Sequence, residues 1–232
     1  MTIRQAMVLA AGRGERLRPL TDRLPKPLVA VNDQPLIVHH LNKLAAAEFE
    51  RVIINLGWLG EQIPPALSQW LETPALSRLE VTYSQEPPGA LETAGGIRHA
   101  LDYFEDEPFA LISSDVMSDF DYRNLHEHVL ADLGHLILVD NPPHHPAGDF
   151  SLLGDRVVST DAEGDVRPAV TYAGFGLFSP GLFRSLPPGH RRLRPVLDQA
   201  IDRQALTGEH FGGRWLDIGT AERLASAQAQ TW

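Results

Sequence analysis

Cysteine is absent from the 232-residue sequence, and lysine occurs only as Lys26 and Lys43. Without a thiol the chain cannot form a disulfide, a thiolate zinc site or an iron–sulfur cluster, and it cannot use a cysteine nucleophile. Long hydrophobic runs are also missing, because the longest, such as residues 6–11, are far shorter than a membrane span. No charged leader with a cleavage site precedes the first strand-like run. We therefore expect a cytoplasmic protein without a membrane partner.

The charge balance is acidic, with 20 basic and 30 acidic residues and a formal net charge of −10. Such a charge opposes broad attraction to nucleic acid or anionic lipid, so no nucleic-acid partner is expected. The first 26 residues differ, because they carry six basic and two acidic side chains. The chain is therefore an acidic protein with one basic corner.

Short strand-like runs alternate with helical segments along most of the chain. Because parallel neighbouring strands need crossover helices, this alternation predicts an α/β fold, a three-layer sandwich around a mostly parallel, Rossmann-like sheet. Residues 141–167, rich in Pro, Gly and Asp, predict a small β insertion with strands over 150–153 and 156–160. We expect residues 1–232 to form a single domain and leave the oligomeric state open. The expected strands are 5–11, 51–56, 79–84, 109–113, 136–139, 170–178 and 214–218, and the expected helices are 35–47, 60–71, 93–103, 121–131, 180–186, 195–204 and 220–228.

A glycine pair, Gly12 and Gly14, follows the first expected strand and can present backbone amides to an anion. The Rossmann fingerprint is excluded because Leu17 stands where a third glycine is needed, and no G-K-[ST] follows to make a P-loop. Prolines break any helix here, which leaves an irregular loop over residues 12–27. Its cations, which suit a triphosphate, are Arg13, Arg16, Arg18 and Lys26. A tight turn with a solvated basic face is the alternative.

The strings LAAGRGERLRPLT (9–21) and LPKPLVAV (24–31) resemble the signature of the sugar-1-phosphate nucleotidylyltransferases. Further matches are GALETAGGI (89–97), FALISSD (109–115), TYAGFGLFSP (171–180) and RWLDIGTAERLASA (214–227). The resemblance implies the nucleotide-diphospho-sugar transferase type of fold. It also implies transfer of a nucleotidyl group from a nucleoside triphosphate to a sugar-1-phosphate, with release of pyrophosphate.

The short length and the segments LETAGG (91–96) and WLDIGT (215–220) favour, by the same resemblance, UTP and N-acetylmuramate α-1-phosphate as substrates, in bacterial cell-wall sugar recycling. A mannose- or glucose-1-phosphate nucleotidylyltransferase is the alternative within the family. A nucleotide-sensing domain without turnover is the alternative outside it.

The resemblance also assigns roles to single residues. Nucleotidyl transfer needs Mg²⁺ to neutralise phosphate charge, and one or two carboxylates hold it in such proteins. Asp115 and Asp217 are the implied Mg²⁺ ligands, although either aspartate could instead satisfy a local turn. Ser113-Ser114-Asp115 stands where relatives commonly have Asn-Gly-Asp. The expected catalytic residues are Arg13 and Lys26, with Lys26 an exposed cation between prolines, and the expected nucleotide-binding residues are Ala11, Gly12, Gly14, Arg18, Gln85 and Gly89.

The sugar side of the site is implied by two segments. In the first, Glu92 and Thr93 could instead simply begin a helix. In the second, Tyr172 and Gly174 lie on a strand whose aromatic residues could instead be packing. Arg167 stands in for a lysine that many relatives carry shortly before this strand.

The ten histidines show no metal-binding spacing. His126 and His128 are two residues apart on an expected helix, so they point to different faces. His144 and His145 lie in a proline-rich loop without a third ligand nearby. Surface histidines are therefore expected.

Overall fold

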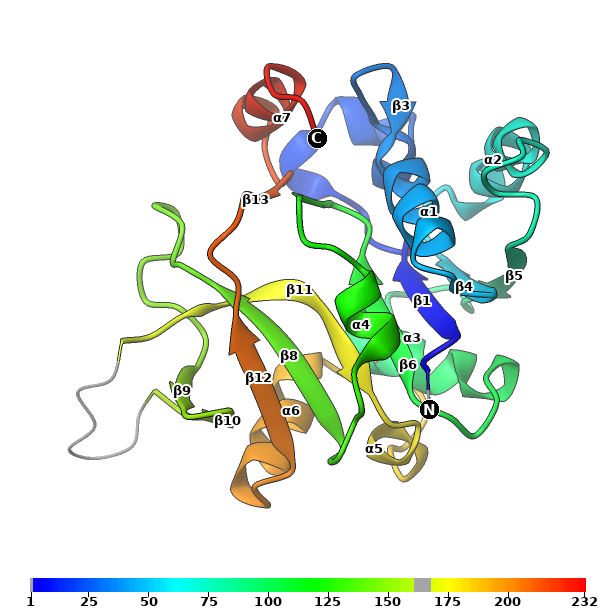
Figure 1. The fold of residues 1–232 in the computed structure, drawn as a ribbon. Helices are drawn as coiled ribbons and strands as arrows, with labels where there is room; N and C mark the ends of the chain where they lie inside the picture. The colour runs from blue at the N-terminus through cyan, green and yellow to red at the C-terminus, as the bar shows by residue number, and fades with distance from the viewer. Residues whose placement is uncertain (1, 161–167) are drawn as a thin grey trace.

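The computed structural model describes residues 2–160 and 168–232, and across them the chain is built around one large mixed sheet (Figure 1). The strands lie in the order β5-β4-β1-β6-β11-β8-β12-β10-β9. Their bounds, in that order, are Glu80–Gln85, Arg51–Leu56, Gln5–Leu9, Phe109–Ser113, Thr171–Phe178, Gly134–Val139, Leu206–His210, Arg156–Val158 and Ser151–Leu153.

Most of the long strands run in one direction. Strands β5, β4, β1 and β6 pair in parallel, and β8 pairs in parallel with β12. Strand β11 is antiparallel to both of its neighbours, β6 and β8. The carboxyl ends of β5, β4, β1, β6, β8 and β12 therefore meet at the same edge, where open α/β sheets bind ligands.

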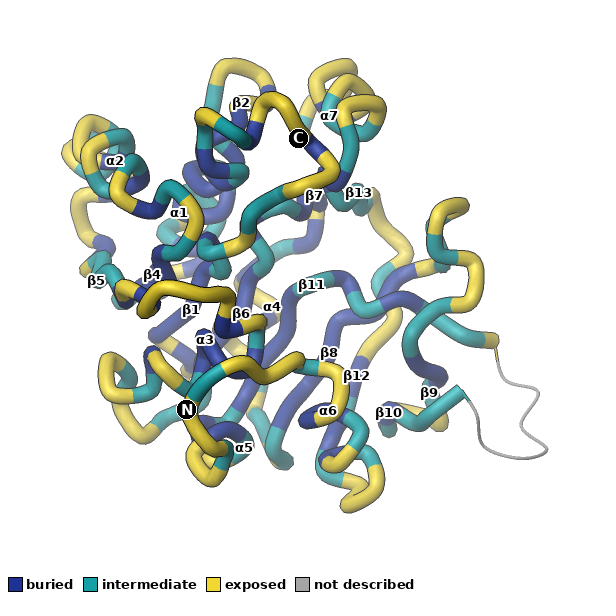
Figure 2. Tube along the Cα trace, turned by 180° about the vertical axis from the view of Figure 1, so that it is seen from behind, coloured by how far each residue is buried: buried dark blue, intermediate teal, exposed yellow. Residues whose placement is uncertain are grey.

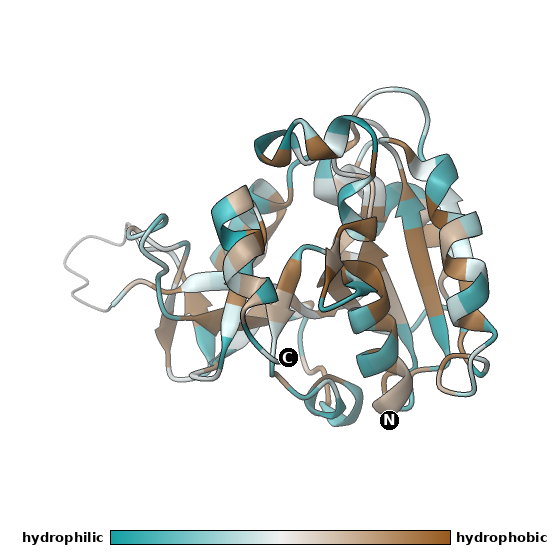
Figure 3. Ribbon diagram, turned by 90° about the horizontal axis from the view of Figure 1, so that it is seen from above, coloured by the Kyte–Doolittle hydropathy of each residue, from teal (hydrophilic) through white to brown (hydrophobic). Residues whose placement is uncertain are grey.

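Helices cover both faces of the sheet and make three layers. Along β1, Ala6 and Val8 pack into one apolar cluster and Met7 into the other, as the two-residue period of a strand requires. Helices α1 (Leu36–Ala46), α2 (Ile63–Leu71) and α4 (Arg123–Glu127) pack on the first face, and α3 (Glu92–Ala100), α5 (Gly181–Arg184) and α6 (Leu193–Asp202) on the second. Figure 2 shows the buried strands between exposed helix surfaces, and Figure 3 shows apolar strands flanked by helices with polar outer sides. The predicted three-layer α/β fold is confirmed.

A smaller apolar cluster lies beyond the carboxyl edge of the sheet. It joins Leu17, Val31 and Leu36 from the N-terminal part to Met117 and Ile218. Here β7 (Val116–Ser118) pairs with β13 (Trp215–Asp217), β2 (Ala30–Val31) pairs with β3 (Gln34–Pro35), and α7 (Ala221–Gln228) follows. Segments from the N-terminal and the C-terminal parts of the chain thus pack together at the edge that carries the candidate site.

Several elements differ from the sequence expectations, among them the short strands β2, β3 and β7, which were not expected. Strand β12 was not expected, because its sequence LTGEH contains residue types that are depleted in strands; pairing with β8 stabilises it instead. Helix α4 spans Arg123–Glu127 rather than 121–131, because the chain is already extended at His128 on its way to β8. The expected insertion forms the hairpin β9–β10 and extends the main sheet at its edge. No helix within the described ranges is long and apolar enough to cross a lipid bilayer.

Three histidines are buried, so the expectation of surface histidines is wrong for them. His40 Nδ1 lies 2.8 Å from the Tyr122 hydroxyl, His126 Nδ1 lies 2.9 Å from the Ile3 carbonyl oxygen, and His135 Nδ1 lies 2.8 Å from Thr207 Oγ1. Polar groups in folded interiors need such partners. Burial lowers the pKa of His40 to about 3 and that of His135 to about 4.

The lowered pKa values of His40 and His135 predict a loss of stability in weak acid. The unfolded chain binds protons on them below about pH 6.5 while the folded chain does not. Between that pH and about 4, the free energy of unfolding should fall by up to about 1.4 kcal/mol per pH unit for each histidine. Urea unfolding of His40→Gln at pH 7, 6 and 5 should show a shallower pH dependence, and the exposed control His190→Gln should keep the wild-type slope. A His40→Gln slope equal to the wild type would contradict this account.

Candidate active site

A cleft of about 1250 Å³ lies at the carboxyl edge of β5, β4, β1 and β6. It separates the loop after β1 from the turn between β5 and α3. Of the predicted site residues it brings together Ala11, Gly12, Arg13, Gly14, Lys26, Gln85, Gly89, Glu92, Thr93 and Asp115. The residues that sequence reasoning did not choose but that also line it include Arg16, Asn55, Trp58, Glu86 and Gly219.

The glycine loop is irregular, as predicted, and its path consists of three short 3₁₀ turns, Glu15–Leu17, Leu20–Asp22 and Lys26–Leu28. Gly14 has a left-handed φ of 66°, which glycine adopts without strain. The Thr21 hydroxyl donates to the Gly14 carbonyl at 2.8 Å and closes the loop on itself. The Gly12 Cα faces open space, because a Cβ there would meet no atom within 4 Å. The loop therefore leaves room for a ligand directly above β1.

Trp58 holds this loop at three points. Its backbone N–H donates to the Ala11 carbonyl at 3.1 Å, and its indole N–H donates to the Thr21 carbonyl at 2.9 Å. The Arg13 guanidinium stacks on the indole ring at 3.5 Å and contacts Asp22 at 3.2 Å. Stacking of this kind stabilises an arginine side chain in one orientation. Trp58 is a residue that sequence reasoning missed, since no local pattern connects it with a loop that precedes it by more than 30 residues.

Arg16 is the loop cation that the sequence analysis noted without assigning it a role. Arg18 contacts Asp22 at 2.9 Å and does not line the cleft. Arg16 lines the cleft, is exposed, and has no ion-pair partner within the described ranges of the chain. Its guanidinium lies over Gly219, where a Cβ would come within 2.8 Å of Nη2. Arg16 therefore connects the loop with the segment that follows Asp217.

Lys26 is not an exposed cation, and this sequence expectation is wrong. Only 12% of its side chain is exposed, and its ammonium group donates to Asp115 Oδ2 at 2.5 Å. The prolines on either side direct the chain into a 3₁₀ turn that points the lysine inward. Lys26 and Asp115 therefore form one charged unit within the cleft.

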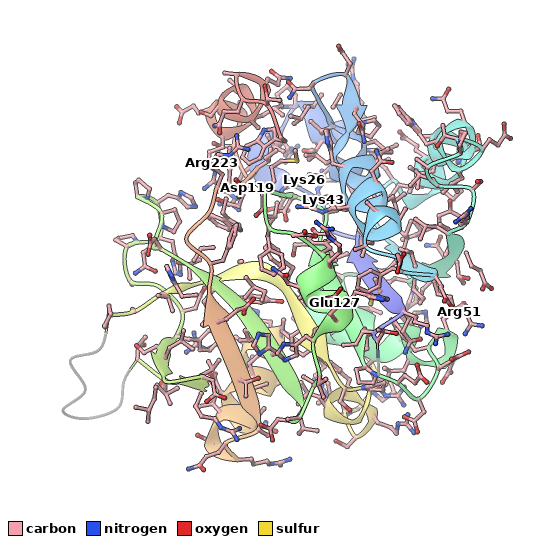
Figure 4. All side chains as sticks on the ribbon, in the orientation of Figure 1. Lys26, Lys43, Arg51, Asp119, Glu127 and Arg223 are labelled. Carbon is pink, nitrogen blue, oxygen red and sulfur yellow. The ribbon has the colours of Figure 1, made fainter. Side chains whose placement is uncertain are left out.

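The two predicted metal ligands are brought together by a short ribbon. Asp217 pairs with Val116 in the β7–β13 register, and the Ile218 N–H donates to the Asp115 carbonyl at 2.7 Å. Asp217 Oδ1 is buried and lies 3.0 Å from His144 Nε2 and 3.2 Å from Arg223 Nη1, without hydrogen-bond geometry to either. Figure 4 shows Lys26 and Arg223 at the same end of the molecule, although they come from opposite ends of the chain.

This pair of carboxylates has the chemistry to hold a divalent cation. Oxygen ligands are those that Mg²⁺ prefers, and one or two protein carboxylates suffice when phosphates and water complete the shell. The buried Oδ1 of Asp217 has acceptor capacity that the protein does not fill. No group of three or more His, Asp or Glu ligands occurs among the residues whose placement is described. Ser114, in place of the family glycine, has no left-handed φ and causes no strain in this turn.

The opposite wall of the cleft is built on a buried amide. Asn55, at the end of β4, accepts from the Ala10 N–H at 2.8 Å and donates to Glu86 Oε1 at 2.7 Å. The pKa of the Glu86 carboxyl is raised above its ordinary value, because the effect of burial exceeds the opposing effect of the hydrogen bond from Asn55. The Gln85 amide donates to the Leu56 and Glu86 carbonyls, each at 3.2 Å, which leaves its side-chain oxygen as the acceptor for a ligand.

Helix α3 begins at the edge of this wall. Glu92 has a left-handed φ of 60°, which is uncommon for a residue other than glycine and occurs at functional sites. The glycine doublet that follows is a packing feature: a Cβ at Gly95 would lie 2.3 Å from the Gly189 carbonyl, and one at Gly96 would lie 2.5 Å from Glu86. The LETAGG segment thus sets how closely α3 approaches the cleft.

The structure does not bring the remaining predicted sugar-binding residues to the cleft. The Tyr172 ring packs against the apolar cluster of α3, α5 and α6, its hydroxyl is buried without a partner among the described residues, and burial raises its pKa. The packing alternative is therefore favoured for Tyr172. Gly174, with a φ of 82°, packs against Ser113 and Val116 behind the Asp115 turn. Arg167 lies outside the described residues.

Comparisons with known proteins agree with this geometry. The profile of the family described as nucleotidyl transferase matches residues 5–232. The chain belongs to this family. It is 43% identical over 233 residues, 97% of each chain, to an N-acetylmuramate α-1-phosphate uridylyltransferase from Neisseria meningitidis. Against the same enzyme of Caulobacter vibrioides the identity is 29%, over 97% of this chain and 96% of the other.

A solved structure supports the fold. It is a Bacillus anthracis protein, provisionally assigned as a glucose-1-phosphate thymidylyltransferase, that superposes with a TM-score of 0.82 at 21% identity. The match covers 97% of this chain and 94% of that one. The expected nucleotidyltransferase fold and family are thus confirmed, and the chain is an enzyme of nucleotidyl transfer.

The Lys26–Asp115 pair can be tested by a double-mutant cycle on stability. Lys26→Met, Asp115→Asn and the double variant, unfolded in urea, should give a coupling of about 1 kcal/mol, because contacting charges couple by about 0.5–3 kcal/mol. The matched control is the exposed pair Arg184–Asp106, with side chains 60% and 78% exposed, whose coupling should be smaller. Equal coupling in the two pairs would contradict the burial described for Lys26.

Proposed function

We propose that the chain transfers the uridylyl group of UTP to N-acetylmuramate α-1-phosphate. The sugar phosphate oxygen bonds to the α-phosphorus of UTP, and the bond to the β-phosphate breaks, so that pyrophosphate leaves. The observation that carries the proposal is the 43% identity to the Neisseria meningitidis uridylyltransferase over 97% of each chain. Action as one domain over residues 1–232, a cytoplasmic location and a role in peptidoglycan recycling belong to the same proposal.

The phosphates of the nucleotide fit the loop after β1. Ala11, Gly12 and Gly14 line the cleft, where their backbone amides would bind phosphate oxygens, and a cation on either side can neutralise the triphosphate. Arg13 is held on Trp58, and Arg16 reaches the opposite side over Gly219. No protein nucleophile is needed, since catalysis of phosphoryl-type transfer is mainly positioning and charge neutralisation.

Lys26 and the two aspartates have separate roles in neutralising the negative charge of the reacting phosphate. Asp115 and Asp217 would hold Mg²⁺, which when bound neutralises phosphate oxygens and aligns the displacement. The Lys26 ammonium, already fixed by Asp115, would donate to the α-phosphate or to the incoming sugar phosphate. Arg18 is a secondary phosphate contact that must leave Asp22 to reach a ligand.

The segment between β5 and α3, with the start of α3, would contact the base and part of the sugar. The Gln85 side chain and the Gly89 backbone would receive the uracil edge, where the free oxygen of Gln85 can accept from the N3–H. Glu92 and Thr93 line the cleft where a sugar hydroxyl or acetamido group could bind. Tyr172, Gly174 and Arg167 stay proposed residues of the sugar side. Tyr172 and Gly174 would act as part of the strand that supports the site.

One alternative within the family has support of its own. A mannose-1-phosphate guanyltransferase of Aspergillus fumigatus is 32% identical over 93% of this chain, which covers 60% of that protein's length. The lower identity favours the uridylyltransferase.

Removing either candidate metal ligand should abolish most turnover. Asp115→Asn and Asp217→Asn remove charge used mainly in the transition state, which costs about 3 kcal/mol or on the order of a hundredfold in kcat. The rate of pyrophosphate release from UTP and N-acetylmuramate α-1-phosphate at limiting Mg²⁺ measures this loss of turnover. Exposed Asp198→Asn on α6 is the matched control. Near wild-type rates in both folded site variants would exclude the two-aspartate site.

The substrate pair is tested by kcat/KM values for N-acetylmuramate, N-acetylglucosamine, glucose and mannose 1-phosphates with UTP and GTP. UTP with N-acetylmuramate α-1-phosphate should be best, and GTP should be poor because a mismatched base leaves buried polar groups unpaired. N-acetylglucosamine 1-phosphate should react more slowly, by the loss of contacts worth about 1–3 kcal/mol per missing group. An optimum with GTP and mannose 1-phosphate would replace the proposal by the guanylyltransferase alternative.

A further inference from the structure

A second cavity, of about 550 Å³, opens beside the cleft at the carboxyl ends of β8 and β12. Its walls come from the segment after β8, from the segment between β12 and β13, and from the start of α7. Asp217 separates it from the cleft: His144 and Arg223, which line the cavity, both approach the carboxylate of this residue. The cavity lies next to the candidate metal ligand, and none of the residues assigned above explains it.

The sheet order indicates which part of the substrates this cavity can reach. Along the carboxyl edge, the base wall follows β5 and β4, the phosphate loop follows β1, and Asp115 follows β6. The second cavity follows β8 and β12, on the other side of β11. A nucleotide bound with its base at Gln85 therefore points its reacting phosphate toward Asp115 and Asp217. An acceptor sugar at that phosphate would therefore lie between the cleft and the second cavity.

Arg223 gives this cavity a cation with unused donors. Its side chain is 13% exposed, and Nη1 lies 3.2 Å from Asp217 Oδ1. Its Nε and Nη2 are buried without a hydrogen-bond partner in the described parts of the chain. Unpaired buried donors are costly, and a charged guanidinium is well shaped to bind a carboxylate with two parallel bonds. His144 adds a second nitrogen 3.0 Å from the same Asp217 oxygen.

The rest of the wall is mainly apolar, but two acidic side chains, Glu222 and Asp140, also line it. Val139, Phe211 and Trp215 line the cavity, and the Trp215 indole N–H is fixed by the Ala173 carbonyl at 2.8 Å. Glu222, in the first turn of α7, is exposed and lines the cavity next to Arg223. Asp140 also lines it and lies 2.9 Å from His210.

We propose that this cavity is the subsite for the acidic ether substituent of the acceptor sugar, with Arg223 as the residue that binds its carboxylate. The inference rests on the proposed function, since it concerns the lactyl group that distinguishes N-acetylmuramate from N-acetylglucosamine. A carboxylate here would supply the acceptor that Nε and Nη2 lack, and the apolar wall would contact the methyl group. His144, 3.0 Å from the Asp217 oxygen that Arg223 also approaches, would help to position this carboxylate.

The test compares two sugars that differ only in this substituent. Wild type, Arg223→Gln and Glu222→Gln are assayed for kcat/KM with UTP and either N-acetylmuramate α-1-phosphate or N-acetylglucosamine 1-phosphate. Because Arg223 also contacts Asp217, both rates fall in Arg223→Gln, and the diagnostic quantity is the ratio of the two kcat/KM values. That ratio should fall by about tenfold or more, the effect of losing a hydrogen bond to a charged group. Binding of UDP-N-acetylmuramate and UDP-N-acetylglucosamine, measured by calorimetry, should show the same loss of preference.

The Glu222→Gln substitution should change the ratio of the two kcat/KM values in the opposite direction. No contact of Glu222 with Asp217 complicates its effect. Removing this negative charge should raise the preference for the acidic sugar by about two- to fivefold, as expected for a partly exposed charge. Glu72→Gln, the same substitution at the exposed end of α2, should leave the ratio unchanged. If Arg223→Gln does not fold, Glu222→Gln and the calorimetry decide the question.

Two failures are distinguishable. Wild type that uses neither sugar phosphate would overturn the proposed function itself. Wild type that prefers the acidic sugar, with the preference unchanged in Arg223→Gln and Glu222→Gln, would overturn the subsite alone.

Discussion

An ammonium group and a carboxylate, 89 residues apart in the chain, meet at 2.5 Å in the middle of the candidate site. Lys26 comes from the loop after β1 and Asp115 from the end of β6, and these two strands are neighbours in the sheet. The pair fixes the loop against the sheet edge and sets the charge at the point where a phosphate would bind. The desolvation cost of enclosing this lysine is limited, because Asp115 is only partly buried and water still solvates one side of its carboxylate.

The same principle operates at the second aspartate. Arg223 and His144 approach Asp217 as Lys26 approaches Asp115, so each carboxylate has the nitrogen of a basic side chain nearby. Such matching keeps two acidic groups close together without strong repulsion before a cation or a nucleotide arrives. Arg13, Arg18 and Lys26 of the basic corner have acidic partners nearby, whereas Arg16 lines the cleft without an ion-pair partner among the described residues.

Local patterns in the sequence were sufficient for most of the fold. Residues close together in the chain determine the apolar runs of β1 and β6 and the glycine loop. The structures of these segments agree with the predictions. The pairing of Asp115 with Lys26, the role of Trp58 and the position of Arg16 over Gly219 depend on contacts between distant segments. Strand β12 forms for the same reason, since its pairing with β8 outweighs its composition. Residue type and spacing carry no record of such contacts, and the buried His40 shows that a polar residue with a distant partner cannot be told from a surface one.

Strand β11, the one long strand of the described sheet that runs against its neighbours, divides the carboxyl edge into two parts. The parallel strands on one side carry the glycine loop proposed to bind phosphates, whereas the strands on the other side carry long connections such as residues 140–150. Substitutions or insertions in those connections leave the register of β1, β4 and β6 unchanged. The fold therefore lets acceptor specificity diverge between relatives while the chemistry of transfer stays constant, so that a single ancestral scaffold could supply activated forms of many different sugars.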